Sequence, residues 1–356
     1  MNKRHIPSLS IRNYRCLGNL DIDPLAHVNL IVGPNNIGKS SLLEAILLWG
    51  TEQHSLTIRD ILLYREGCNV ESPDRFRMQP FLGLHNLFSG FPVLSPGTSP
   101  ISVGTADKKQ TTKLRIYPAD SPRNFMMSSG PPIAFGSPTD SNNTPGVTLL
   151  GEELKYPPDE ERRLWHYLDN KCLYLSPNMN GAARIPTSKL WEQVEIASRE
   201  TAVIDALRLI ESGIEKVFFI GSNPRMPVCR IKGLQHPVSL HGMGDGVVRL
   251  FELILGIVNV ADGICLIDEF ENGLHWSVQE QVWDVVFQTA KKLDVQIFAT
   301  THSYDTVKAF QTVALRQENG NFGEIIQMRK RGGVTIANPI VGDEIRKILQ
   351  YEVEVR

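Results

Sequence analysis

The sequence predicts an α/β fold built on a parallel β-sheet, and three short apolar runs carry this prediction. The runs are Val28–Val32, Ile264–Ile267 and Val295–Ala299. Nearly continuous apolar runs of this length are typical of strands in a parallel sheet, because helices cover both faces of such a sheet. The first run leads through a glycine-rich turn into a predicted helix, which is the order of a strand–turn–helix unit.

The first part of the chain, residues 1–60, contains the strands and the helix that surround this turn. Two short apolar segments, Leu9–Ile11 and Leu20–Ile22, precede the first buried strand. A helix is expected from about Lys39 to Trp49.

The middle part, residues 61–158, has a different composition and is predicted to be a proline-rich, partly β and partly flexible arm. It holds 13 of the 22 prolines, and proline at this density breaks helices and central strands. Short strands are expected at Ile101–Val103 and Lys113–Tyr117, and a mobile loop at Ala119–Gly146. A partner-binding arm and a tolerated surface insertion explain this composition equally well.

The last part, residues 159–356, returns to alternating strands and helices. The expected elements, besides two of the apolar strands named above, are helices over Glu160–Leu168, Glu195–Glu211 and Val247–Val258 and a strand over Val217–Ile220. A further helix is expected to begin at Ser277, since Glu280 three residues later completes a capping box.

The composition is that of an ordinary globular protein and argues against several classes. Hydrophobic residues make up 42% and charged residues 21% of the chain, and the formal net charge of -2 gives no global basic field for nucleic acid. The five cysteines are scattered without a CxxC pair, which argues against a zinc site. The longest apolar stretch, Leu250–Ile267, contains Glu252 and Asp262 and is too polar to span a membrane. We therefore expect a cytoplasmic protein without membrane contact.

A phosphate-binding loop is predicted at residues 33–40, which read GPNNIGKS and match the pattern G-x-x-x-x-G-K-[ST]. Gly33 and Gly38 let the backbone N–H groups wrap closely around a phosphate, and the following helix directs its positive end at the same place. Lys39 adds a charge for the β- and γ-phosphates, and the Ser40 hydroxyl is a ligand for Mg²⁺. The alternative is a glycine-rich turn that binds no nucleotide.

Two more polar clusters follow the other apolar strands. Asp268 and Glu269 end the segment GICLIDE, where Asp268 is placed to hold Mg²⁺ and Glu269 to polarise an attacking water. His302 ends the segment ATTHS and is a candidate sensor of the γ-phosphate, although a lone histidine is more often structural. Ligands bind at the carboxyl ends of strands in α/β sheets, which favours the functional interpretation of both segments.

A second glycine-rich turn, LHGMGDG at residues 240–246, directly precedes the helix that begins at Val247. A helix start of this kind is another anion site, and it need not serve the same nucleotide as residues 33–40. Taken alone, it is equally explained as an ordinary turn into a helix.

These motifs in this order resemble the ABC-type ATPases of the RecF/SMC/OLD branch. GPNNIGKSSLLEAI resembles the Walker A motif of that branch, LHGMGDG its signature, LIDEFENGLH its Walker B motif and D-loop, and ATTHS its H-loop. The opening segment LSIRNYRCLGNLDI resembles the first hairpin of these ATPase heads. The resemblance covers about residues 8–50 and 165–356 and implies a P-loop NTPase fold of the ABC-type head class.

The resemblance implies an ATPase that uses ATP and Mg²⁺. The implied catalytic residues are Glu269 and His302, and the implied metal ligands are Ser40 and Asp268. The implied nucleotide-binding residues are Arg15, Gly33, Asn35, Asn36, Gly38, Lys39, Ser40, Ser41, Gly242 and Gly244. Gly242 stands where the signature motif usually has serine, so a hydroxyl contact to the γ-phosphate is missing.

The resemblance also implies partners. In ABC heads, the signature of one subunit covers the nucleotide held by the other, so we expect a head-to-tail dimer or a larger self-assembly. The expected role is to couple nucleotide state to a nucleic-acid-processing effector in phage defence or DNA repair, with contact to nucleic acid possible. The alternative is a nucleotide-gated scaffold or sensor that sequesters an effector protein. About fifty residues follow His302, too few for a TOPRIM nuclease, so a nuclease of that kind is expected to be a separate polypeptide.

Overall fold

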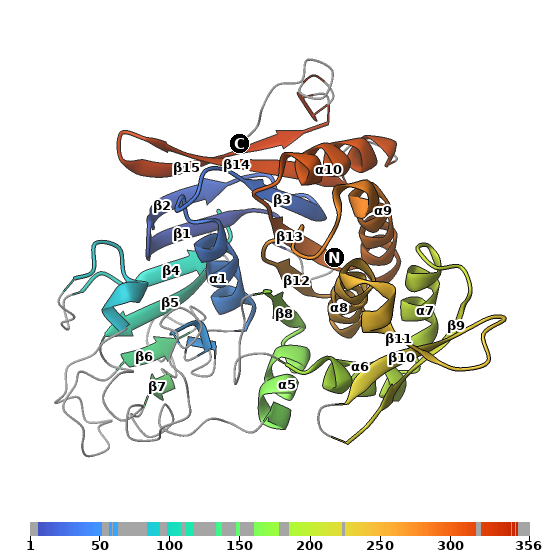
Figure 1. The fold of residues 1–356 in the computed structure, drawn as a ribbon. Helices are drawn as coiled ribbons and strands as arrows, with labels where there is room; N and C mark the ends of the chain where they lie inside the picture. The colour runs from blue at the N-terminus through green and yellow to red at the C-terminus, as the bar shows by residue number, and fades with distance from the viewer. Residues whose placement is uncertain are drawn as a thin grey trace.

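The computed structural model arranges the chain around two six-stranded sheets and one three-stranded sheet (Figure 1). The residues that the structure describes are 6–51, 57–58, 60–62, 84–92, 98–107, 111–116, 133–136, 147–149, 160–177, 185–222, 225–317, 322–342, 344–345 and 347.

The central sheet confirms the predicted α/β class. Its order is β15-β14-β3-β13-β12-β8, and all neighbours are parallel except the edge strand β15. The strands are β3 (Val28–Val32), β8 (Cys172–Leu175), β12 (Ile264–Ile267), β13 (Gln296–Thr300), β14 (Gly323–Arg331) and β15 (Val334–Val341). The three apolar runs of the sequence are thus the adjacent strands β3, β13 and β12. Because these strands are parallel, the loops that follow them lie along one edge of the sheet.

The second six-stranded sheet is antiparallel and has the order β2-β1-β4-β5-β6-β7. Its strands are β1 (Leu9–Tyr14), β2 (Leu17–Ile22), β4 (Ile101–Gly104), β5 (Thr111–Ile116), β6 (Ile133–Gly136) and β7 (Val147–Leu149). β4 and β5 were expected from the sequence, whereas β6 lies inside the segment 119–146 that was expected to be a loop. The rest of that segment lies outside the described residues. The strands of the proline-rich part therefore extend the sheet that β1 and β2 begin.

Helix α1 (Lys39–Gly50) lies between the two large sheets, in contact with β1 and β4 on one side and with β8, β12 and β13 on the other (Figure 1). Burial on both sides explains why its residues from Leu42 to Leu48 are almost all apolar. The exception is Glu44, which is fully buried and receives a hydrogen bond of 3.0 Å from the Tyr14 hydroxyl. The Arg15 guanidinium lies 3.0 Å from the same carboxylate, so this ion pair fixes α1 to the β1–β2 hairpin.

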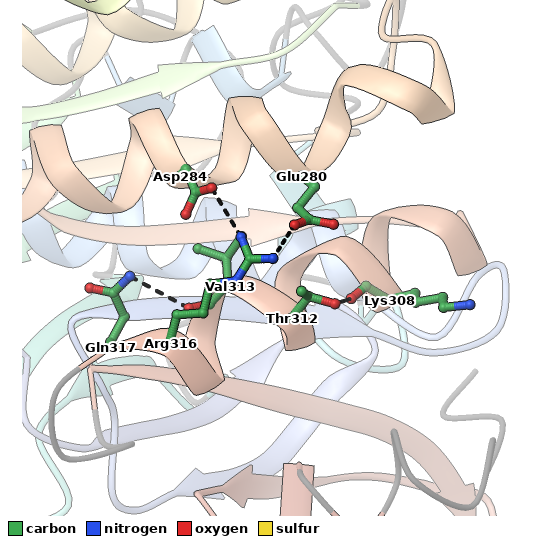
Figure 2. Close-up of polar contacts among 7 residues, drawn as sticks. All are labelled: Glu280, Asp284, Lys308, Thr312, Val313, Arg316 and Gln317. Atoms are coloured by element: carbon green, nitrogen blue, oxygen red, sulfur yellow. Dashed lines mark hydrogen bonds and ion pairs between the residues drawn. The ribbon is translucent and has the colours of Figure 1, made fainter. Parts of the chain in front are cut away.

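Three helices cover the other face of the central sheet: α8 (Asp245–Asn259), α9 (Trp276–Leu293) and α10 (Tyr304–Arg316) (Figure 1). Arg316 at the end of α10 joins two acidic residues of α9, Glu280 and, at 3.4 Å, Asp284 (Figure 2). These side chains are all partly exposed, so the pairing adds little to stability. The packing of α9 on α10 depends instead on buried apolar residues such as Trp283 and Phe310.

The helices α6 (Thr187–Ile196) and α7 (Glu200–Arg208) and the short helix η3 (Leu240–Met243) pack on α8. The small sheet has the order β11-β10-β9 and consists of β9 (Ile214–Ile220), β10 (Met226–Ile231) and β11 (Val238–Ser239). Helix α5 (Glu160–Asp169) packs on β8, and the short helix η1 (Leu84–Leu87) lies beside the β1–β2 turn, where the Arg15 N–H donates to the Leu87 carbonyl oxygen at 2.9 Å. No helix in the described ranges has the length and apolar character needed to cross a membrane.

Two local predictions were wrong. The expected helix Glu195–Glu211 is two helices, because the chain turns at Ser198, whose φ of 53° is incompatible with a continuing right-handed helix. The expected capping box at Ser277 is absent, because α9 begins one residue earlier at Trp276. Its N-cap is His275, whose ring accepts a hydrogen bond from the Ser277 N–H at 3.4 Å.

A buried glutamate on β14 makes the stability of the fold depend on pH. Glu324 on β14 is fully buried opposite Asn29 of β3, and burial raises its pKa to about 8, partly offset by the backbone N–H of Ala26. In the unfolded chain a glutamate has a pKa of about 4.3. Between these two values the folded state holds a proton that the unfolded state has lost, so this residue makes stability fall as the pH rises.

Glu324→Gln is therefore expected to lose less stability than the unchanged protein when the pH rises from 5 to 8. The amide cannot ionise, so the contribution that falls with pH, which amounts to a few kcal/mol for a shift of this size, is removed. Urea unfolding at both pH values measures the difference. Parallel losses of stability in the two proteins would contradict the buried, protonated state of Glu324.

Candidate functional site

The loop between β3 and α1 has a backbone that only glycine can adopt at two positions. Gly33 has a φ of 148°, and a Cβ there would collide with the carbonyl oxygen of Met328 on β14. Gly38 has a φ of 108°, and a Cβ there would lie 2.5 Å from Cys16 Sγ. Strand β14 therefore packs closely against the loop at Gly33, and the β1–β2 turn packs closely against it at Gly38. Neither position has room for a side chain, which explains the glycine spacing of the motif.

The rim of this loop is exposed and its base is buried. Pro34, Asn35 and Asn36 face solvent, whereas Ile37 is 4% exposed. Asn36 adopts a left-handed φ of 59°, a conformation that asparagine tolerates better than most residues. The exposed rim leaves the backbone of the loop accessible to a ligand. Ser41 is the third residue of α1 and is buried.

Lys39 is folded back into the loop. Its Nζ donates hydrogen bonds to the carbonyl oxygens of Gly33 at 2.7 Å and Pro34 at 3.0 Å, and it lies 3.2 Å from Nδ1 of His302. The side chain is 5% exposed, and this burial lowers the pKa of Lys39 to about 8. Three carboxylates offset part of the shift, in the order Asp268, Glu271 and Glu269.

Asp268, directly after β12, is 3% exposed and lies next to the loop. One of its carboxylate oxygens accepts hydrogen bonds from Ser40 Oγ at 3.2 Å and Thr300 Oγ1 at 2.5 Å. The other accepts from the Tyr174 hydroxyl at 2.9 Å. A serine hydroxyl beside a carboxylate at a phosphate loop is an oxygen donor set that fits Mg²⁺, which takes its remaining ligands from phosphate and water.

Glu269 has an unusual backbone conformation. Its φ of 49° is left-handed, which costs a non-glycine residue about 1–2 kcal/mol. Hydrogen bonds hold this conformation: the Glu269 N–H donates to Thr300 Oγ1 at 2.9 Å, and its carbonyl accepts from Arg249 Nη2 at 3.3 Å. Strain of this kind is retained where a side chain must be held in one direction.

His302 lies on the loop after β13, exposed and close to Lys39. Its backbone N–H donates to Oε1 of Glu271 at 2.7 Å, so the loops that follow β12 and β13 are joined here. The structure thus brings Lys39, Ser40, Asp268, Glu269 and His302 to one edge of the central sheet.

The second glycine-rich turn stands apart from this cluster. Gly242 and Gly244 are both exposed, and a Cβ on Gly244 would meet no atom within 4 Å. Gly244 has a φ of 104° and directly precedes α8. In the described part of the chain, no hydrogen bond joins this turn to residues 33–41.

Arg15 occupies the turn between β1 and β2, with a left-handed φ of 47°. Its guanidinium pairs with the buried Glu44 in the middle of α1, the helix that begins at Lys39. In this structure, Arg15 therefore supports the helix behind the phosphate loop.

Sequence reasoning missed several residues of the site, namely Tyr174, Arg249, Glu271 and Thr300. Of these four, only Thr300 had a signal in the sequence, since it directly follows the apolar run Val295–Ala299, at the strand end where ligands bind. Arg249 lies within the apolar helix α8 and donates to the carbonyl oxygens of Asp268 and Glu269.

A glycine-constrained loop with a buried lysine, opposite an aspartate at the end of a neighbouring parallel strand, defines a P-loop protein. Two family models match the chain: one described as "AAA ATPase domain" over residues 5–79, and one described as "AAA domain, putative AbiEii toxin, Type IV TA system" over residues 169–307. Together with the fold, these matches support the prediction of an ABC/RecF/SMC-like ATPase.

Curated relatives and solved structures agree with this class. An ATP/GTP phosphatase of Helicobacter pylori is 23% identical over 98% of both chains. The DNA replication and repair protein RecF of Nitrosococcus oceani is 40% identical over 63 residues, which cover 18% of this chain and 17% of RecF. The Smc head domain of Pyrococcus furiosus, solved with the C-terminal domain of ScpA, shares the fold with a TM-score of 0.50 at 12% identity, over 98% of this chain and all of that chain.

Lys39→Ala is expected to abolish most ATP binding, because it removes the charge at the centre of the loop. The unchanged protein is expected to take up protons when it binds MgATP at pH 8, since Lys39 has a pKa of about 8 before binding and is favoured in its charged form beside phosphate. The uptake should approach about half a proton at pH 8 and vanish near pH 6.5.

Calorimetric titration in two buffers of different ionisation enthalpy measures both quantities. Unchanged affinity in Lys39→Ala would contradict the assignment of the loop. Binding without proton uptake at pH 8 would contradict the buried state of Lys39 in the free protein.

Proposed function

We propose that this chain binds MgATP at the P-loop and hydrolyses it to ADP and phosphate. The observation that carries the proposal is the contact between Ser40 on α1 and Asp268 after β12, which joins the phosphate loop to a buried carboxylate. In this proposal the nucleotide contacts the loop from Gly33 to Ser41, including the exposed Asn35 and Asn36. Arg15 acts indirectly, through its ion pair with Glu44 in α1, the helix that begins at the loop.

Each residue has a definite task in the proposed reaction. Ser40 and Asp268 would hold Mg²⁺, which would supply positive charge to the phosphates when bound. Lys39 leaves the carbonyl oxygens of the loop and turns to the β- and γ-phosphates. Glu269 accepts a proton from water, whose oxygen attacks the γ-phosphorus while the bond to the β-phosphate oxygen breaks. His302 contacts the γ-phosphate from the loop after β13.

The proposal includes a head-to-tail dimer. The exposed turn at Gly242 and Gly244 stands at the start of α8 with open space around it, and no described hydrogen bond connects it to the P-loop of its own chain. A helix start with this geometry attracts an anion. We therefore assign it to a nucleotide on a second copy, as the resemblance to ABC heads implies.

The proposed role is to couple the nucleotide state to an effector that processes nucleic acid, in phage defence or in repair, within the cytoplasm. Residues 1–60 and 159–356 would form the ATPase head and 61–158 an arm available to that effector, for example a separate TOPRIM nuclease. The alternative is a scaffold or sensor that sequesters and releases an effector protein. Stimulation of ATP hydrolysis by DNA distinguishes the two roles, because only the first requires DNA to communicate with the site.

Glu269→Gln is expected to bind MgATP and to hydrolyse it at least about a hundredfold more slowly, since the amide keeps the shape of the side chain and cannot accept the proton. With ATP present, this variant should accumulate as a dimer or larger species in light scattering. Glu280→Gln, at a partly exposed residue of α9 that pairs with Arg316, is the matched control and should hydrolyse ATP normally. A normal rate in Glu269→Gln would show that another group is the base.

Mixing two inactive variants tests the composite site. Gly244→Arg places a long side chain where the proposal has only backbone near a phosphate, so it should bind ATP and fail to hydrolyse it. Lys39→Ala lacks a working P-loop but keeps the second glycine-rich turn. A mixed dimer contains one complete site, so hydrolysis should partly recover on mixing. Mixed dimers that form without any recovery would show that each site is built within one chain.

A further inference from the structure

Glu271 lies two residues after Glu269, in the loop that leads from β12 to α9. Phe270 between them is fully buried and stacks on Trp283 of α9 at 3.7 Å, which anchors the loop. The Phe270 N–H also donates to the carbonyl oxygen of Thr300 at 3.0 Å. Glu271 is therefore held at a fixed place beside the end of β13.

The two carboxylate oxygens of Glu271 have different surroundings. Oε1 accepts the hydrogen bond from the His302 backbone N–H at 2.7 Å. Oε2 is buried and, within the described residues, receives no hydrogen bond. A buried carboxylate oxygen without a donor is costly to the fold, and a site that retains one has room for a donor that arrives with a ligand.

The charge of Glu271 acts on the phosphate loop. It raises the pKa of Lys39 against the larger lowering effect of burial, and it does so more strongly than Glu269. Glu271 and Lys39 therefore belong to one charged cluster. His302 links them physically, since its backbone contacts Glu271 and its ring lies 3.2 Å from Lys39 Nζ.

We propose that Glu271 is a second carboxylate of the hydrolytic site, with one oxygen fixing the backbone of His302 and the other accepting a hydrogen bond from a water molecule that enters with the nucleotide. This proposal rests on the hydrolysis of ATP at the P-loop. Glu271 acts as a positioning residue: it orients water and His302, while the proton of the attacking water goes to Glu269.

Glu271→Gln separates the two contacts. Its amide oxygen still accepts from the His302 N–H, whereas its amide nitrogen donates and cannot accept from water. The affinity for MgATP is therefore expected to stay within about threefold, and kcat to fall about tenfold to a hundredfold, the range for losing one hydrogen bond to a charged group. Glu280→Gln on α9 is the matched control, with both values unchanged.

The remaining outcomes overturn the proposal. A wild-type kcat in Glu271→Gln would show that Oε2 has no part in hydrolysis. Loss of MgATP affinity together with kcat, or loss of a cooperative unfolding transition, would show a purely structural residue. A wild-type protein without ATPase activity would overturn the proposed function and this inference together, whereas normal hydrolysis by both the wild type and Glu271→Gln would overturn this inference alone.

Discussion

The carboxylate of Asp268 accepts hydrogen bonds from three hydroxyl groups, on Ser40 of α1, Tyr174 of β8 and Thr300 of β13. A buried carboxylate is tolerated only when its oxygens are satisfied, since desolvation of an unpaired charge costs several kcal/mol. The three hydroxyl groups can meet at one place only if β8, β12 and β13 are parallel and end at the same edge. The order of the central sheet and the chemistry of the site are therefore two consequences of one arrangement.

The parts of this arrangement that depend on residues close together in the sequence could be predicted from the sequence. VNLIV had to be a strand buried on both faces, and the glycines at 33 and 38 had to bend the chain toward a helix that starts at Lys39. The positions of Asp268 and His302 at strand ends followed from two apolar runs that are each followed by polar residues. The local mistakes have local causes, because the left-handed turn at Ser198 and the histidine cap at His275 lack a distinctive sequence pattern.

The contacts that could not be predicted join residues far apart in the chain. Tyr174 reaches Asp268 only because β8 pairs with β12, and nothing near Tyr174 in the sequence indicates that neighbour. Arg15 was expected to approach phosphate from its place in a family motif, yet its partner in this structure is a glutamate inside an apolar helix. Glu271 resembles an ordinary loop residue until the position of the His302 backbone is known. A pattern in one sequence describes a continuous segment of the chain. The roles of these residues depend on contacts between segments that are distant in the sequence.

The position of β3 has a consequence for how the protein is made. This strand leaves the ribosome long before its two neighbours in the sheet, β13 and β14, which come much later in the sequence. Until both have been synthesised, VNLIV has no partner on either side and remains an unpaired apolar strand. A nascent chain that already contains every residue of the phosphate loop therefore lacks the sheet that shapes it. Contacts of such long sequence separation slow folding and lengthen the period in which the chain is prone to aggregate.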